Sequence, residues 1–271
     1  MSACTQVDLI YSFADDVLAS RAKSFLDMSD DRDESHLRAT IDDLFSAETS
    51  TLAPAYSSFL RGQAGLLERS AGGPTRDEAD ALVAEFRDLL VASSETAAPY
   101  FARVLVRHTT PGRLDHFEAA LAEWREERRE EDEDMTPAEA LAERIERTTE
   151  QVERFVPDLT DTQLETIAAF VERDMARREP GRWLLYTERR HAALIAFLRT
   201  RPDEAAIAAY MVPWLSRPYE LVDPAFEAHA EAWWAGKAEL VWLVARDLSA
   251  EQRIALIEKL RGYATDIAAL I

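Results

Sequence analysis

Apolar residues recur every three or four positions along most of the chain, the spacing that places side chains on one face of an α-helix. Residues 5–27 carry this pattern first, and Leu37, Ile41 and Leu44 repeat it afterwards. No stretch keeps up the alternation of apolar and polar residues expected of a half-buried strand. The pattern predicts an all-α protein, a multi-helix bundle of roughly ten helices.

Short segments rich in Ser, Thr and Asp separate the predicted helices. Residues 160–163 (Thr-Asp-Thr-Gln) and 249–252 (Ser-Ala-Glu-Gln) each place a hydroxyl three positions before a long amide side chain. This is the pattern of a capping box, in which the hydroxyl accepts from a free N–H group of the new helix. Looser forms of the same corner begin at Ser29 and Thr110. We interpret these corners as helix starts, so none of their residues is assigned a catalytic role.

Proline and glycine suggest further breaks. Separate helices are expected around 37–45 and over 51–69, and residues 71–74 (Ala-Gly-Gly-Pro) should end the second of these. Pro99 is expected to kink or divide the helix that contains it, because proline lacks the N–H group that a helix interior needs.

Charge suggests how the chain divides. Residues 126–134 are nine charged residues in succession, mostly acidic, and we expect them to form a solvated helix end or an exposed linker. A cap and a proline at residues 136 and 137 then restart a helix. Two helical halves are therefore predicted, residues 1–134 and residues 135–271.

The 51 acidic residues outnumber the 31 basic ones and leave a formal net charge of −20. Such a field repels phosphate polymers and anionic lipid head groups, so nucleic acid is not expected as a partner. Cys4 is the only cysteine, which excludes an intramolecular disulfide and a cysteine-based zinc site. No apolar run reaches the ~18 residues that a membrane-spanning helix needs.

Candidate chemistry is sparse. Glu188 and His191 have the i, i+3 spacing that di-iron helical bundles use, and Asp33 with His36 is a partial second example. The further glutamates that such a centre requires cannot be identified. We assign no catalytic residue, metal ligand or cofactor, and a metal-dependent enzyme using Glu188 and His191 is kept as an unfavoured alternative.

Aromatic residues gather in the second half. Either they form a large core that seals helix crossings, or they line an apolar groove for a peptide, lipid or glycan. The adjacent Trp233 and Trp234 cannot both point into one seam, so one of them is expected to lie at a groove or to pack under the segment from Pro213 to Pro218. The candidate groove residues are Trp183, Tyr186, Trp214, Trp233 and Trp234.

The start of the chain and its corners resemble a family of uncharacterised bacterial lipoproteins of the proteobacterial type, known only as a domain of unknown function. Ser2-Ala3-Cys4 resembles the end of a lipobox, and residues 11–15 (Tyr-Ser-Phe-Ala-Asp) resemble the family's Tyr-x-x-Ala-Asp motif at the right distance. The corners at 160–163 and 249–252 are similar to its later Leu-Thr-x-x-Gln corners. The first corner departs from the pattern, with Arg32 in place of the glutamine.

The resemblance implies that Cys4 carries a lipid and anchors the protein at the periplasmic face of the outer membrane; if Met1 is the true start, a cytoplasmic location is implied instead. The leading hypothesis is a non-enzymatic, lipid-anchored helical protein of the cell envelope that binds or scaffolds, with a protein or peptide as a possible partner. The alternative is a soluble helical protein that holds an apolar ligand or peptide in the tryptophan-lined groove.

Overall fold

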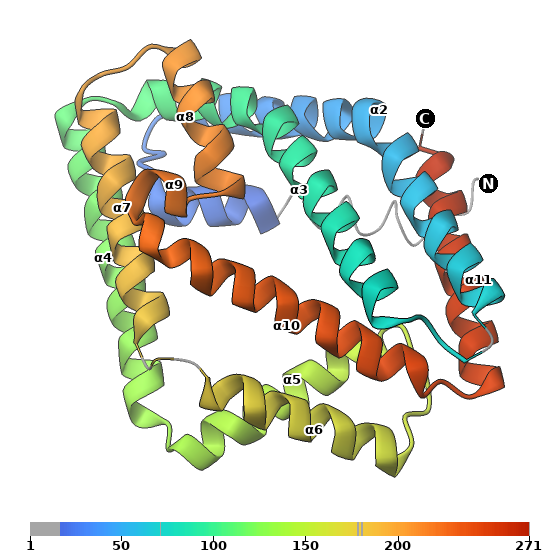
Figure 1. Cartoon of the computed structure of the whole chain (residues 1–271). Coiled ribbons are helices and arrows are strands. Elements are labelled where there is room, and N and C mark those ends of the chain that lie inside the picture. Colours follow the sequence, from blue (N-terminus) through green and yellow to red (C-terminus); the bar gives the residue numbers. More distant parts are fainter. Residues whose placement is uncertain (1–16, 71, 178, 180, 271) are drawn as a thin grey trace.

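A computed structural model describes residues 17–70, 72–177, 179 and 181–270, and within these ranges the chain forms helices and no strand (Figure 1). Residues 17–25 are helical and precede the first labelled helix. The labelled elements are α2 (Asp31–Arg69), α3 (Arg76–Leu105), η1 (Val106–His108), α4 (Pro111–Asp134), α5 (Pro137–Glu153), α6 (Asp161–Ala176), α7 (Arg182–Arg199), α8 (Glu204–Ser216), α9 (Tyr219–Val222), η2 (Pro224–Phe226), α10 (Glu227–Arg246) and α11 (Ala250–Ala268). The all-α prediction is confirmed.

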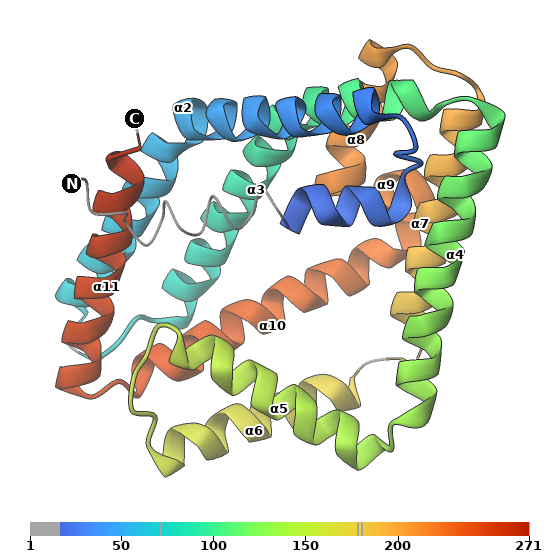
Figure 2. The same ribbon diagram turned by 180° about the vertical axis from the view of Figure 1, so that it is seen from behind.

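The long helices are arranged as a frame with two helices crossing its interior (Figures 1 and 2). α2 packs along α11 at one side, α4 along α7 at the opposite side, and α5 with α6 closes the lower edge. α3 and α10 cross between these edges, and α8 packs against α3. None of the described helices combines the length and apolar character that crossing a bilayer requires.

Two main hydrophobic clusters hold the frame together. The first joins the helix at 17–25 to α3, α4, α7 and α8, with Leu114, Leu198 and Ile207 almost fully buried. The second joins α2, α5, α6, α10 and α11 around Ala64 and Ile167, neither of which is exposed at all. Each cluster draws helices from both sides of residue 134. The division into halves at that residue stays a prediction.

The capping corners begin helices as expected. Thr160 and Ser249 each accept a hydrogen bond from the backbone N–H three residues later, and both bonds of the capping box are present. Thr136 does the same at the start of α5, which follows directly on the charged end of α4. The expectation for Ser29 was wrong, because the neighbouring Asp30 caps α2 by accepting from the N–H of Arg32.

One of the expected breaks is absent, because residues 31–69 form one helix through Pro54. α3 continues through Pro99 without division, which contradicts one of the two alternatives predicted there, a divided helix, and leaves the other, a kink. α2 turns a corner within its length in both views, which is the bend that a proline inside a helix produces (Figures 1 and 2). Packing on both sides keeps the helix intact: Ala53 is buried, and the Ser57 hydroxyl donates to the carbonyl of Ala264 on α11 at 2.7 Å.

The turn between α2 and α3 lies close to the end of α10. Gly73 has φ of +83°, and a Cβ atom there would stand 2.5 Å from the Cα atom of Arg246. Only glycine meets both conditions without strain. The predicted break at 71–74 is confirmed for the described residues 72–74, which lie outside any helix.

The two capping corners meet in the interior. Gln163 and Gln252, 4% and 6% exposed, each donate from Nε2 to the Oε1 atom of the other, at 2.9 and 3.0 Å. Gln163 also donates to the carbonyl of Asp247, and Gln252 donates to those of Pro157 and Asp158. The start of α6 is thereby fastened to the start of α11.

Candidate functional site

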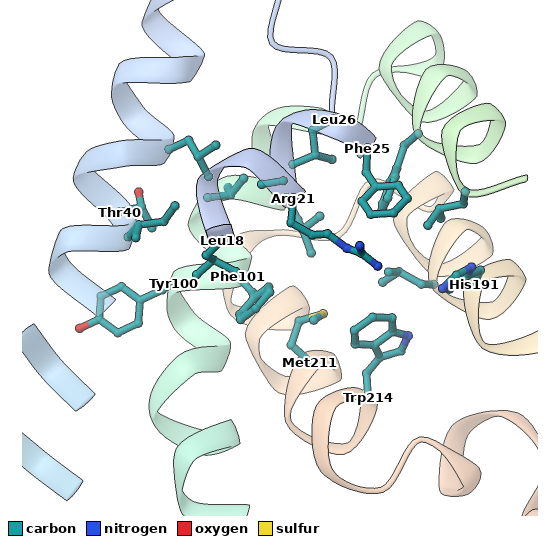
Figure 3. A pocket seen from close by; sticks show the side chains of 18 of the residues that line it. Leu18, Arg21, Phe25, Leu26, Thr40, Tyr100, Phe101, His191, Met211 and Trp214 are labelled. Atoms are coloured by element: carbon teal, nitrogen blue, oxygen red, sulfur yellow. The ribbon is translucent and has the colours of Figure 1, made fainter. Parts of the chain in front are cut away.

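An apolar pocket of about 350 Å³ lies where six elements meet, within the range of small-molecule sites (Figure 3). The helix at 17–25 forms one wall, and α2, α3, α4, α7 and α8 supply the others. Nearly all of the lining is aliphatic, aromatic or methionine. Representative lining residues are Leu18, Phe25, Ile41, Phe101, Leu121, Leu194, Met211 and Trp214.

Two arginines interrupt this apolar lining. The guanidinium of Arg190 lies 3.9 Å from the ring centroid of Trp214, and its Nε atom is buried with no hydrogen-bond partner in the part of the chain that the structure describes. Burial lowers the pKa of Arg190. Arg21 extends between Phe25 and Trp214 in Figure 3, toward His191. In the described chain no carboxylate lies within ion-pair distance of Arg190 or Arg21.

His191 adds a neutral polar group at the same end of the pocket. Its Nδ1 atom accepts a hydrogen bond from Arg125 at 3.3 Å, which places its ring proton on Nε2. Burial, with Arg190 and Arg125 close by, lowers the pKa of His191 to about 4. The imidazole is therefore uncharged at neutral pH, and the positive charge of the pocket comes from its arginines.

The two spacing-based metal candidates do not come together. Glu188 is exposed on α7, while His191 is engaged with Arg125. Asp33 is buried and paired with arginines, and the Nε2–H of His36 donates to the carbonyl of Arg103 at 3.2 Å. Among the residues that the structure describes, no three His, Cys, Asp or Glu side chains form a group that could hold a metal ion.

A second hollow, the basic cleft, has a volume of about 820 Å³. It is bounded by α4, α5, α7, η2 and α10 at the lower part of the frame in Figure 1. Among the described residues that line it, Glu179 is the single acidic one. The basic lining residues are Arg128, Arg144, Arg147, Arg182 and Lys237, with His229 beside them.

Four of the five predicted groove residues line this basic cleft: Trp183, Tyr186, Trp233 and Trp234. Trp183 is 55% and Trp233 38% exposed, whereas Tyr186 is buried and stacks on Phe226 with ring centroids 3.7 Å apart. Burial raises the pKa of Tyr186 to about 12, and its hydroxyl has no hydrogen-bond partner among the described residues.

Trp214, the fifth predicted residue, lines the apolar pocket instead. Trp124 of α4 lines both hollows, although it lies outside the aromatic-rich second half. Its place on an apolar helix face was visible in the sequence, but its partners on α7 were not. Sequence reasoning also missed Arg21 and Arg190, since no local feature shows that an arginine lines a pocket.

Cys4, the predicted lipid attachment site, lies outside the described residues. Comparison with curated proteins and with solved structures gave no match. Residues 24–217, more than two thirds of the chain, match a family described as a family of unknown function. This span contains the whole lining of the apolar pocket except the beginning of its first helix. The chain belongs to the family of unknown function DUF6279.

Proposed function

We propose that this member of DUF6279 is a non-enzymatic binding protein that holds an anionic amphiphile, a single alkyl chain ending in a carboxylate, in the apolar pocket. The observation that carries the proposal is Arg190, a cation enclosed at the edge of an apolar pocket without an acidic partner among the described residues. This chain has 51 acidic residues, so the lack of a partner at this position stands out.

The energetics favour a ligand that carries its own charge. A partly buried cation without a counter-charge is costly, and the Trp214 ring offsets only part of that cost, by at most on the order of 2 kcal/mol. A carboxylate can accept two hydrogen bonds from a guanidinium, including one from the orphaned Nε atom. Each methylene group moved into the apolar lining adds about 0.8 kcal/mol.

The ligand class is tested by direct binding to the purified protein. Dodecanoate, dodecanol and dodecylamine share one alkyl chain and differ in head-group charge, and displacement of a fluorescent fatty acid reports their affinities. We expect dodecanoate to bind most tightly of the three. Equal binding of all three, or no binding by dodecanoate, would contradict the proposal.

Arg190→Met tests the assigned cation, with Arg189→Met as its matched control. Arg189 is the next residue on α7, but it is exposed and paired with Asp223 at 2.6 Å. We expect Arg190→Met to weaken dodecanoate binding by at least about tenfold, the equivalent of one charge-assisted hydrogen bond, and to leave dodecanol unaffected. Arg189→Met should bind both as the wild type does. Unchanged dodecanoate binding by Arg190→Met would refute the role of this arginine.

We further propose that the protein is attached to the bacterial envelope through a lipid on Cys4, as the lipobox-like Ser2-Ala3-Cys4 sequence supports. Two or more acyl chains anchor a protein stably, each methylene contributing about 0.8 kcal/mol. The gene is expressed with its native upstream codons, and the envelope-associated protein is analysed by mass spectrometry. Acylation of Cys4 is expected, whereas an unmodified cytosolic product that begins at Met1 would exclude the anchor. A Cys4→Ser variant should be released from the membrane fraction.

A further inference from the structure

We propose that the basic cleft is a docking site for a short acidic segment of a partner protein, one in which acidic residues are interspersed with apolar ones. The site is separate from the apolar pocket except that Trp124 lines both, and the proposal does not depend on the amphiphile.

The first reason is a local inversion of charge. Among the described lining residues, five arginine and lysine side chains stand against one carboxylate, although the chain as a whole carries a formal charge of −20. Random placement of 31 basic residues among 51 acidic ones would favour the opposite balance. A positive patch on an acidic protein attracts an acidic ligand and orients it toward this one place.

Two of these cations, Arg128 and Arg147, have surface partners that a ligand can replace. Arg128 pairs with Glu131 at 2.6 Å, Arg147 pairs with Glu143, and all four side chains are about half exposed. Ion pairs of this kind contribute about 0–1 kcal/mol. Exchanging them for the carboxylates of a docked segment therefore costs little.

The second reason is the way that cations and aromatic rings alternate. Lys237 lies 5.1 Å from the ring centroid of Trp233, and Arg182 lies 5.6 Å from that of Phe226. Trp183 and Trp233 keep large exposed surfaces on α7 and α10. Tryptophan, tyrosine and arginine are the residues that most often dominate the binding energy of protein interfaces. A segment with alternating acidic and apolar side chains would contact both kinds of group.

The surroundings of the cleft favour a short segment over a long polyanion. The acidic run at residues 126–134 belongs to α4, which also supplies Trp124 and, from within the run, Arg128 to the cleft. A nucleic acid or sulfated polysaccharide would extend past the cleft onto this run, within a Debye length of roughly 8–10 Å. A few carboxylates confined to a hollow of about 820 Å³ avoid that repulsion.

The test uses a fluorescein-labelled peptide of alternating glutamate and phenylalanine, with binding to the full chain measured by fluorescence anisotropy. The same peptide with lysine in place of glutamate controls for apolar adsorption. We expect the glutamate peptide to bind, more weakly as salt is raised, and the lysine peptide not to bind. Absent binding of the glutamate peptide, or equal binding of the two peptides, would overturn the proposal. Tighter binding of a heparin fragment or a single-stranded oligonucleotide would overturn the partner class.

The double variant Arg128→Glu/Arg147→Glu locates the site. We expect it to weaken binding of the glutamate peptide at least about tenfold, as for hot-spot charges. Arg61→Glu/Arg261→Glu makes the same charge change on α2 and α11, at exposed positions outside the cleft, and should bind as the wild type does. Equal losses in the two double variants would show general repulsion and refute the site.

Trp183→Ala provides a second route that leaves the charge unchanged. Its side chain is 55% exposed, so its removal should leave the fold intact, as circular dichroism can confirm. We expect weaker peptide binding, whereas Phe155→Ala, which removes an aromatic ring that is 44% exposed on a different part of the surface, should have no effect. If Trp183→Ala binds the peptide as tightly as the wild type does, the exposed aromatic rings of the cleft do not contribute to peptide binding, and that part of the proposal is refuted.

Discussion

At the scale of single residues, Asp33 shows how a charged side chain can be buried in this protein. It is 3% exposed in the first turn of α2 and accepts hydrogen bonds from Arg107 at 2.9 Å and from Arg113. Burial alone would raise the pKa of Asp33, but the hydrogen bonds and charges of the two arginines outweigh burial and hold it below the usual value. The carboxylate therefore links α2 to η1 and α4 instead of serving a metal.

Asp33→Asn should lower the free energy of unfolding by about 3 kcal/mol, because it leaves two arginines facing a neutral group in a buried position. Urea unfolding measures the change. Asp31→Asn is the matched control: it removes an acid from the same helical turn at an exposed site, and the expected loss is under about 1 kcal/mol. Equal losses in the two variants would attribute the effect to the helix dipole rather than to the buried ion pairs.

At the scale of secondary-structure elements, local rules account for where helices begin but not for where they meet. The Thr160 and Ser249 corners are recognisable because a capping box spans four residues. The break expected between residues 45 and 51 is absent and α3 is not divided at Pro99, because proline's lost hydrogen bond is a local cost, whereas the packing that outweighs it comes from α11 and α8. The Gln163–Gln252 pair joins residues 89 positions apart, beyond any local signal.

Removing one amide of this pair should cost more than removing an ordinary capping residue. We expect Gln252→Ala to lower the free energy of unfolding by about 2–3 kcal/mol, because the amide of Gln163 and two backbone carbonyls lose a buried partner. Glu139→Ala removes the equivalent residue of an exposed capping box and should cost only about 0.5–1 kcal/mol.

A double-mutant cycle separates the contribution of the mutual Gln163–Gln252 hydrogen bonds to stability from the contributions of the two helix caps. Because Gln163→Ala and Gln252→Ala each break the same mutual bonds, the double variant should lose less than the sum of the singles, by about 1 kcal/mol or more. Additive losses would mean that the two corners act independently and that their contact contributes nothing of its own.

At the scale of the whole molecule, one buried and one partly buried histidine make the free energy of unfolding depend on pH. His108 is 1% exposed, and burial, with Arg113 nearby, lowers its pKa to about 4; the pKa of His191 is also about 4. Both pKa values are near 6.5 in the unfolded chain. Between pH 6.5 and 4 the unfolded chain binds protons that the folded chain does not. The free energy of unfolding therefore has its full value above pH 6.5 and falls as the pH drops toward 4.

His108 accounts for a loss of about 3 kcal/mol in the free energy of unfolding across this pH interval. The loss from His191 is smaller because its side chain is partly exposed. Urea unfolding at several pH values measures the slope. His108→Gln should flatten it whatever its effect on stability at neutral pH, whereas His116→Gln, at an exposed position, should leave it unchanged. A slope that His108→Gln does not alter would mean that His108 titrates alike in the folded and unfolded chains.

The amino-acid sequence by itself determined that the protein is helical, where most of its helices begin, and that its net charge is strongly negative. These properties depend on spacing within a few residues or on composition. Only the tertiary structure decided that α2 and α3 continue through proline, that Asp33 faces arginines 74 and 80 residues away, and that the predicted tryptophans divide between an apolar pocket and a basic cleft. These outcomes depend on which helix faces meet, since burial and charge at each site are set by residues far apart in the chain.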